Sequence, residues 1–301
     1  MDNQCKGRGR SKASQDLILW AANWFAENHP ASIRAVCYQL FIAGHIRSMA
    51  KNETNKVSTL LRKAREEGLL PWAHVVDETR EAERISTWAN PEEIIKASVR
   101  QYRRDAWQDQ PEWVEVWSEK GTIRGTLAPV LKKYGVTFRV MHGYGSATAL
   151  NSIAGETINA DKPLTVLYLG DFDPSGMHMS EVDIPQRLAR YGGAATFKRI
   201  ALTVDDVGSL PSFDAATKAG DGRHNWFVDR YGGKCWELDA MPPADLRARV
   251  EGEILSLLDA PAWEHSEKIE QAEAQSMKSF FDDWSSISRQ APKYSEGVNN
   301  G

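Results

Sequence analysis

Apolar and polar positions follow a helical rhythm through the first quarter of the chain. In residues 31–43 apolar side chains recur at i, i+3, i+4, i+7 and i+8, namely Ile33, Val36, Cys37, Leu40 and Phe41. A stripe of this kind has to face a core, so the pattern predicts a helix. Two more helices are expected, one that begins in LILWAANWFAEN and one over about 53–67 that buries Val57, Leu60, Leu61 and Ala64. The stretch GLLPWAHVVDETR that follows indicates a short hairpin or an extended segment.

After a helix expected over 91–107, the rhythm changes to short apolar runs that alternate with helical patterns. Alternating β and α units of this length indicate a parallel, Rossmann-like sheet with helices on both faces. In such a sheet the functional site lies beyond the carboxyl ends of the strands. The runs expected to be strands are EWVEVWSE, TFRVMHG, LTVLYLGD, FKRIALT and WELDA.

The two rhythms predict an α/β protein with an N-terminal winged helix-turn-helix, because three helices and an extended segment are the outline of that motif. A parallel-sheet domain follows it. The expected boundaries are a flexible basic arm at 1–16, the winged helix at 17–88, a connecting helix at 89–110, the sheet domain at 111–258, and a C-terminal helix with a disordered tail, SISRQAPKYSEGVNNG, at 259–301.

Composition narrows the class of protein. With 301 residues, 42% of them apolar, the chain can bury a sizeable core. Its apolar runs are far shorter than the roughly 18–20 residues of a membrane span, and its first residues are too polar for a secretory signal, so we expect a cytoplasmic protein with no membrane partner. The 3 cysteines are widely spaced and indicate neither a disulfide framework nor a zinc site.

The net charge of −4 conceals an asymmetry along the chain. Residues 1–80 carry 12 Lys+Arg against 8 Asp+Glu, whereas the remainder is acidic. The third expected helix turns Lys56, Arg62, Lys63 and Arg65 toward solvent. These side chains are a candidate surface for binding double-stranded DNA, although a solvated helix face is the ordinary alternative.

Three carboxylates stand at expected strand ends. Glu119 ends the first strand of the sheet domain, and Asp171 and Asp173 end the third. Since the carboxyl ends of parallel strands share one edge, we expect the three to converge there. Hard oxygen donors of this kind suit Mg²⁺, or Mn²⁺ in its place. The commoner role of an aspartate at a strand end is to cap the next helix.

The layout of these acids resembles the Toprim domain shared by topoisomerases, bacterial primases and some nucleases. More specifically, EK at 119–120, HGYGS at 142–146 and GDFDPSG at 170–176 resemble the A subunit of topoisomerase VI and its relative, the meiotic double-strand-break transesterase. The resemblance covers about residues 30–255. In that family a winged helix precedes the Toprim domain and carries the nucleophilic tyrosine, in a segment that reads roughly Arg, acid, Ile, Tyr, Tyr.

The segment SIRAVCYQLF at 32–41 matches this motif, with Tyr38 on the catalytic tyrosine and Arg34 on the arginine. The two are four residues apart on a helix, so they share a face, off the centre of the apolar stripe, from which both can reach a phosphate. A tyrosine at the edge of the core is the alternative for Tyr38. The chain departs from the family pattern at Ala35, where an acid is usual, at Cys37, where the first tyrosine stands, and at Ser175, where an aromatic residue is usual.

The resemblance implies Mg²⁺-dependent cleavage of double-stranded DNA by transesterification, carried out by a homodimer, with one tyrosine for each strand. No ATPase domain is expected, so ATP-driven strand passage would need a separate ATPase subunit; the chain resembles short relatives found on phages and mobile elements. Two alternatives stay open. One is a hydrolytic Toprim nuclease that uses metal-activated water, and the other is a non-catalytic winged-helix DNA-binding protein.

A loop is the last candidate feature. The segment TKAGDGRHNW, at 217–226, joins the fourth expected strand to WELDA and brings Lys218, Asp221 and Arg223 toward the sheet edge. Loops at that edge commonly carry function. A plain surface loop is the alternative.

Overall fold

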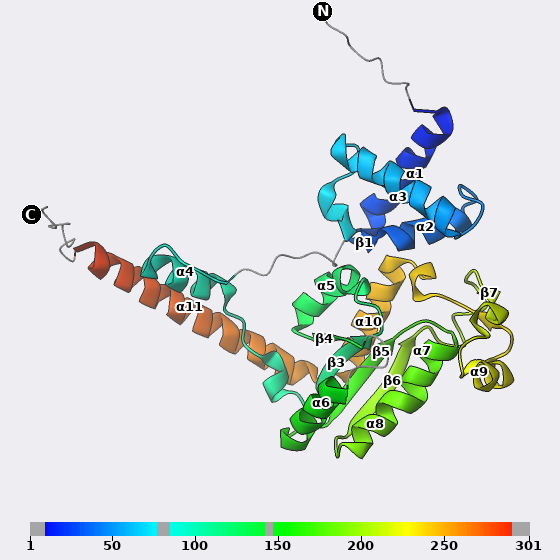
Figure 1. The fold of residues 1–301 in the computed structure, drawn as a ribbon. Coiled ribbons are helices and arrows are strands. Elements are labelled where there is room, and N and C mark those ends of the chain that lie inside the picture. The colour runs from blue at the N-terminus through cyan, green and yellow to red at the C-terminus, as the bar shows by residue number, and fades with distance from the viewer. Residues whose placement is uncertain (1–9, 77–84, 142–146, 291–301) are drawn as a thin grey trace, which may run out of the picture. The chain divides into compact units, whose positions relative to one another are not determined.

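The structure is a computed structural model that describes residues 10–76, 85–141 and 147–290. The chain forms two compact units, drawn in Figure 1. Unit 1 contains residues 1–81 and 112–257, and unit 2 contains residues 82–111 and 258–301. No helix within the described ranges has the length and apolar character needed to cross a membrane.

Unit 1 begins with three helices: α1 (Lys12–Asn28), α2 (Ile33–Ile42) and α3 (Lys51–Glu66). Ser32 caps α2 by accepting a hydrogen bond from the Ala35 N–H at 3.1 Å. The predicted apolar stripes of α2 and α3 are confirmed, because both pack into one core with α1. Its buried members are Ile18, Ala21, Phe25, Ala31, Val36, Cys37, Leu40, Ile46, Val57, Leu61, Ala64, Leu70 and Val75.

The expected flexible arm at 1–16 is wrong for its last residues, and residues 1–9 of that expectation lie outside the described residues. Ser11 caps α1 by accepting the Ser14 N–H, so residues 12–16 are already helical. After α3 the sequence predicts a short hairpin or an extended segment, and the described part, residues 68–76, ends in an extended strand and contains no hairpin. There a 3₁₀ turn at Trp72–His74 leads into β2 (Val75–Val76), which pairs in parallel with β1 (Ala31–Ser32). Residues 77–80 of that expectation lie outside the described residues.

A four-stranded parallel sheet forms the centre of unit 1, which confirms the predicted α/β class. The strands are β3 (Trp113–Ser118), β4 (Thr137–Val140), β5 (Leu164–Leu169) and β6 (Ala195–Ala201), in the order β4-β3-β5-β6. All six residues of β5 are buried, as expected for a central parallel strand. The glycine turn at 142–146, which the resemblance uses, lies outside the described residues.

Helices cover both faces of this sheet (Figure 1). On one side α5 (Ile123–Tyr134) packs with α10 (Pro243–Leu257), and on the other α6 (Ala147–Asn159) packs with α8 (Ile184–Arg190). The short helix α7 (Pro174–His178) follows β5 directly, and a π-helical turn at Met179–Asp183 joins it to α8. A second pair of strands, β7 (Phe213–Asp214) and β8 (Lys234–Cys235), is antiparallel and flanks α9 (His224–Tyr231).

The prediction of a sheet strand at WELDA is wrong. Trp236 makes a single antiparallel bridge to Phe172, and Leu238–Ala240 form a 3₁₀ turn. The Leu238 N–H donates to the Asp171 carboxylate at 2.7 Å and not to a neighbouring strand. The two prolines that follow, at 242–243, have no N–H to donate, so a strand could not continue past Met241.

Unit 2 consists of α4 (Pro91–Gln101), a 3₁₀ turn at Ala106–Asp109 and the long helix α11 (Ala260–Gln290). Arg104 joins its parts through ion pairs with Asp109 at 3.3 Å and with Glu273 at 3.2 Å. The helix expected over 91–107 therefore ends early and belongs with the C-terminal helix. The predicted disordered tail is wrong for its first five residues, 286–290, which continue α11, and residues 291–301 of that expectation lie outside the described residues.

Candidate functional site

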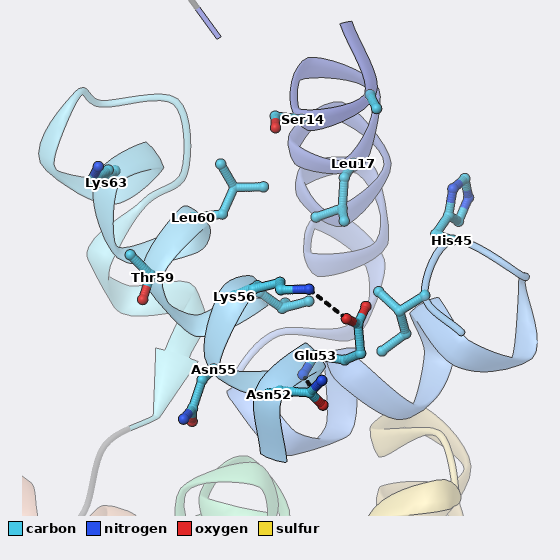
Figure 2. Close-up of a pocket in the computed structure, with 13 residues that line it drawn as sticks. Ser14, Leu17, His45, Asn52, Glu53, Asn55, Lys56, Thr59, Leu60 and Lys63 are labelled. Atoms are coloured by element: carbon cyan, nitrogen blue, oxygen red, sulfur yellow. Dashed lines mark hydrogen bonds and ion pairs between the residues drawn. The ribbon is translucent and has the colours of Figure 1, made fainter. Parts of the chain in front are cut away.

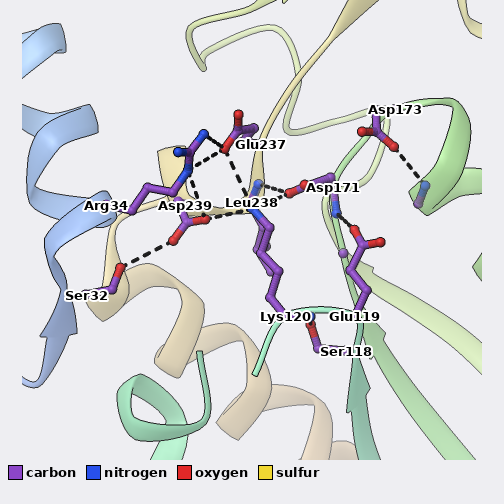
Figure 3. Close-up of polar contacts among 12 residues, drawn as sticks. Ser32, Arg34, Ser118, Glu119, Lys120, Asp171, Asp173, Glu237, Leu238 and Asp239 are labelled. Carbon is purple, nitrogen blue, oxygen red and sulfur yellow. Dashed lines mark hydrogen bonds and ion pairs between the residues drawn. The ribbon is translucent and has the colours of Figure 1, made fainter. Parts of the chain in front are cut away.

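Glu119 and Asp171 come together at the carboxyl edge of the sheet, as the sequence predicts. They follow β3 and β5, which are neighbours paired through Ser118 and Leu169. The Asp171 N–H donates to Glu119 Oε1 at 3.1 Å (Figure 3). Gly176 makes this approach possible, since a Cβ there would lie 2.4 Å from the Asp171 carbonyl oxygen and 3.1 Å from Glu119 Oε1.

Asp173 is used differently from the other two acids. Its Oδ1 accepts the Gly176 N–H at 2.8 Å and so caps α7, while its Oδ2 pairs with Lys218 Nζ at 3.2 Å. Figure 3 draws Asp173 apart from Glu119. In the three described stretches of the chain, no group of three or more Asp, Glu, His or Cys side chains is arranged to hold a metal ion. The structure therefore gives two adjacent acids and a third that serves as a helix cap.

Lys120 lies at the centre of a charged cluster that sequence reasoning did not assign. Its Nζ is 2.7 Å from Asp171 Oδ1, 2.7 Å from Asp239 Oδ2 and 3.8 Å from Glu237 Oε2. The lysine side chain is 18% exposed and that of Asp239 only 3%. We call Lys120, Asp171, Glu237 and Asp239 the lysine cluster.

Burial strengthens the interactions between the charged groups at the carboxyl edge of the sheet. Burial, and next the nearby Asp171, raise the pKa of Glu119 to about 7. Burial alone would lower the pKa of Lys120, but the charges of Asp239 and Asp171 outweigh it and raise that pKa above its ordinary value. Lys120 is therefore a permanent cation at physiological pH.

Helix α2 carries Arg34 and Tyr38 to the same edge. Arg34 Nε donates to Glu237 Oε2 at 2.6 Å and lies 3.8 Å from Asp239 Oδ2. One turn later, the Tyr38 ring centroid is 5.7 Å from the Arg34 guanidinium. The next residue, Gln39, donates to the Ala240 carbonyl at 3.2 Å. The predicted common face of Arg34 and Tyr38 thus packs against the segment that contains Glu237 and Asp239.

Tyr38 is covered in this arrangement. It is 5% exposed, yet it is not a member of the three-helix core. Burial, and then the charge of Glu237, raise the pKa of its hydroxyl, while Arg34 and Lys120 act in the opposite direction. The hydroxyl is consequently a protonated phenol that shares its surroundings with the lysine cluster.

Arg199 supports the loop that carries the acids. Its guanidinium donates to the carbonyl oxygens of Gly170 at 2.8 Å, Asp171 at 2.6 Å and Gly176 at 3.2 Å. Sequence reasoning missed Glu237, Asp239 and Arg199. Glu237 and Asp239 could have been noticed, because their acid-x-acid spacing is the same as that of Asp171 and Asp173. Arg199 had no such signal, since its hydrogen-bond partners are backbone carbonyl oxygens and the Ser180 hydroxyl at 2.6 Å, which no sequence spacing links to it.

The three loop candidates have different partners in the structure. Lys218 reaches the site through its ion pair with Asp173. Arg223 Nη1 instead pairs with Asp221 Oδ1 at 2.9 Å, within the loop itself. Among the contacts between described residues, Lys218 therefore reaches one of the predicted acids, whereas Asp221 and Arg223 pair with each other.

The basic residues of α3 also differ from one another. Lys56 pairs with Glu53 at 2.6 Å, Arg62 pairs with Glu66, and Lys63 is exposed. Arg65 packs over the Trp72 ring at 4.2 Å and donates to the Trp72 carbonyl at 3.2 Å. Lys56 and Lys63 line a groove of about 640 Å³ between α1 and α3 (Figure 2), which has Leu17 and Leu60 in its wall. Arg65 is thus tied to the fold, whereas the other three face solvent.

The chain matches no family model, no curated protein and no solved structure in comparisons with known proteins.

Proposed function

We propose that the protein cleaves double-stranded DNA by tyrosine transesterification, with Tyr38 as the nucleophile. One observation carries the proposal. Helix α2 brings Arg34 and Tyr38 against Glu237 and Asp239, and Lys120 joins that segment to Asp171 beside Glu119. Phosphoryl transfer to a side chain needs a nucleophile and groups that stabilise the charge on the phosphate. At this edge of the sheet the nucleophile would be the tyrosine, and the stabilising groups would be the arginine and a metal ion held by the strand-end carboxylates.

The chemical step uses groups of this chain. The Tyr38 oxygen forms a bond to a backbone phosphorus while the bond from phosphorus to the 3′ oxygen breaks. The phenolic proton passes to water and the departing 3′ oxygen takes one from water, which leaves a 5′-phosphotyrosine and a free 3′-hydroxyl. Arg34, exposed at one side of Tyr38, would exchange Glu237 for a non-bridging phosphate oxygen. The covalent link conserves the bond energy, so the reverse reaction can rejoin the strand.

Glu119 and Asp171 are the residues that would hold Mg²⁺ or Mn²⁺. They fit such an ion because they are adjacent, largely buried carboxylates, and burial followed by the charge of Asp171 raises the pKa of Glu119. Mg²⁺ is commonly bound through one or two carboxylates together with substrate phosphates, so the cap role of Asp173 does not prevent binding. When bound, the ion would stabilise negative charge on the reacting phosphate.

The rest of unit 1 supplies the DNA surface in this proposal. The three-helix part would be a winged helix and the sheet part a Toprim domain. Lys56, Arg62 and Lys63 project from α3 and would pair with backbone phosphates. Because one tyrosine cuts one strand, a double-strand break requires a homodimer.

The burial of Tyr38 favours a second candidate, a hydrolytic nuclease in which water replaces the tyrosine. A protonated phenol that is 5% exposed cannot attack until α2 shifts or substrate reorganises the site. A water held near Glu119 and Asp171 needs no such shift. The two candidates predict different products, since hydrolysis leaves no protein on the DNA.

A denaturing gel that detects protein bound to DNA tests both candidates. We expect the parent protein with Mg²⁺ or Mn²⁺ to form a covalent adduct, and Tyr38→Phe to fold and bind DNA without forming one. Tyr191→Phe, which alters a partly buried tyrosine packed against the core of the sheet, is the control and should still form the adduct. Free cut ends at the parent rate from Tyr38→Phe would establish the hydrolytic reaction. No adduct and no cutting by the parent protein would contradict both candidates.

A further inference from the structure

Lys120 makes the contacts that a bridging metal ion would make. Its Nζ lies 2.7 Å from one oxygen of Asp171 and 2.7 Å from one oxygen of Asp239, and Glu237 is its next carboxylate at 3.8 Å (Figure 3). In sites with two metal ions, a shared carboxylate bridges ions about 3.5–4 Å apart. Here Asp171 is the shared group, because it contacts Lys120 with its side chain and Glu119 with its backbone N–H.

The charges explain why the position needs a cation. Asp171, Glu237 and Asp239 are three carboxylates with side-chain exposures of 14%, 22% and 3%. Uncompensated carboxylates in so buried a place repel one another and lose their hydration. Arg34 neutralises Glu237 from one side, and Lys120 is the cation that reaches both aspartates.

Among the described residues, two groups donate to the Asp171 side chain, and both contact the same carboxylate oxygen. Oδ1 accepts from Lys120 Nζ and from the Leu238 N–H. Oδ2 is therefore the oxygen that a divalent ion shared with Glu119 would use. An ion there and the ammonium group of Lys120 would flank the same carboxylate, as two metal ions do in a two-metal site.

We propose that Lys120 is a built-in cation that takes the place of a second divalent ion between Asp171 and Asp239, so that this site binds one divalent ion and not two. The proposal rests on the proposed function, because it takes Glu119 and Asp171 to be the residues that hold the one exchangeable ion. Lys120 acts as a positioning residue. It fixes the orientation of the Asp171 carboxylate before metal or DNA arrives.

Removal of the ammonium group should open the second position. In Lys120→Ala the shortened side chain leaves Asp171, Asp239 and Glu237 without their common cation and leaves room for a hydrated ion. Lys120→Met removes the charge but keeps most of the volume, so it should not admit a second ion. Lys133→Ala is the matched control, because Lys133 contacts a single carboxylate, that of Glu251, at 2.7 Å.

The test is a titration of the full-length protein with Mn²⁺ in the absence of DNA. Calorimetry gives the number of ions bound, and electron paramagnetic resonance distinguishes isolated Mn²⁺ from a spin-coupled pair. We expect one ion with an uncoupled spectrum for the parent protein, Lys133→Ala and Lys120→Met. We expect two ions with a coupled spectrum for Lys120→Ala.

Three results would overturn the proposal. Two ions in the parent protein would do so without any variant, which keeps the test valid even if Lys120→Ala fails to fold. One ion in both the parent protein and a folded Lys120→Ala would overturn this proposal alone and leave the proposed function intact. No ion in the parent protein would overturn the metal role of Glu119 and Asp171, and this proposal with it.

Discussion

Gly176 leaves no room for a side chain beside the candidate site. A Cβ at this position would lie 2.4 Å from the Asp171 carbonyl oxygen, so Gly176→Ala must displace the loop that carries Asp171. We expect a loss of roughly 1–3 kcal/mol in the free energy of unfolding, the usual cost of forcing extra atoms into a packed place. Urea denaturation measures the loss, and Mn²⁺ affinity should fall with it.

Gly155 provides the matched control for this substitution. It lies within α6, and a Cβ there would meet nothing within 4 Å. Alanine is the better helix former, so Gly155→Ala should stabilise the protein by about 0.5–1 kcal/mol. Equal effects at the two glycines would mean that the space beside Asp171 does not decide the outcome.

The lowered pKa of Asp206 predicts how the stability of the protein changes in acid. Burial alone would raise its pKa, but the hydrogen bonds from Arg249 at 2.7 Å and from the Thr203 N–H and hydroxyl outweigh burial and lower it. A carboxylate whose pKa is lower in the folded state adds stability at neutral pH. That contribution is lost as the pH falls below the ordinary value of 3.8 toward the lower pKa of the folded state.

Asp206→Asn should therefore lower the free energy of unfolding at pH 7 by roughly 1–3 kcal/mol, the cost of leaving a buried partner unsatisfied. The variant should also lose less stability than the parent protein between pH 5 and about pH 2, because it has no such carboxylate to protonate. Denaturation curves over this range measure both effects. The exposed neighbour, Asp205→Asn, should behave like the parent protein.

Single residues could be predicted where a local rule governs them. Arg34 and Tyr38 share a face because a helix repeats every 3.6 residues, and Glu119 meets Asp171 because parallel strands end at one edge. No local rule predicts that Lys120 contacts Glu237 and Asp239. Their meeting depends on the 3₁₀ turn at Leu238–Ala240, where the sequence pattern predicted a strand.

At the scale of elements, burial decides which patterns can be interpreted. The apolar runs at β3 and β5 are buried along nearly their whole length, so their sequences indicate strands clearly. The helix α4 has no buried residue, and its pattern could not fix where it ends. The pairing of β2 with β1 joins segments more than forty residues apart, which no local pattern specifies.

The helix α3 carries a prediction that separates binding from folding. Lys56 and Lys63 face solvent, so replacing each by alanine should weaken DNA binding at every sequence. Each lysine removed from a phosphate should also reduce the dependence of log affinity on log salt by about one ion. Fluorescence anisotropy at several salt concentrations measures both quantities. Unchanged affinity and salt dependence would mean that another surface binds DNA.

Arg65→Ala should have the opposite profile. Arg65 packs over the Trp72 ring and donates to the Trp72 carbonyl, so its removal should lower thermal stability while the salt dependence of DNA binding stays close to that of the parent protein. A large change in salt dependence without a change in stability would make Arg65 a phosphate-binding residue.

At the scale of the whole molecule, the proposed reaction requires two chains for a double-strand break. Each chain brings one Tyr38, and one tyrosine cuts one strand, so cutting both strands at one place depends on two active subunits in a dimer. A mixture of parent protein and Tyr38→Phe at equal concentrations, allowed to exchange subunits, should contain about one quarter of dimers with two tyrosines and about one half with one. Double-strand breaks in supercoiled plasmid should therefore fall to roughly a quarter of the parent value, while nicked circles with one attached protein appear.

A mixture with Tyr191→Phe is the control and should keep the parent ratio of breaks to nicks. If breaks fall only by half in the mixture with Tyr38→Phe, and no nicks accumulate, the chains do not exchange or do not act in pairs.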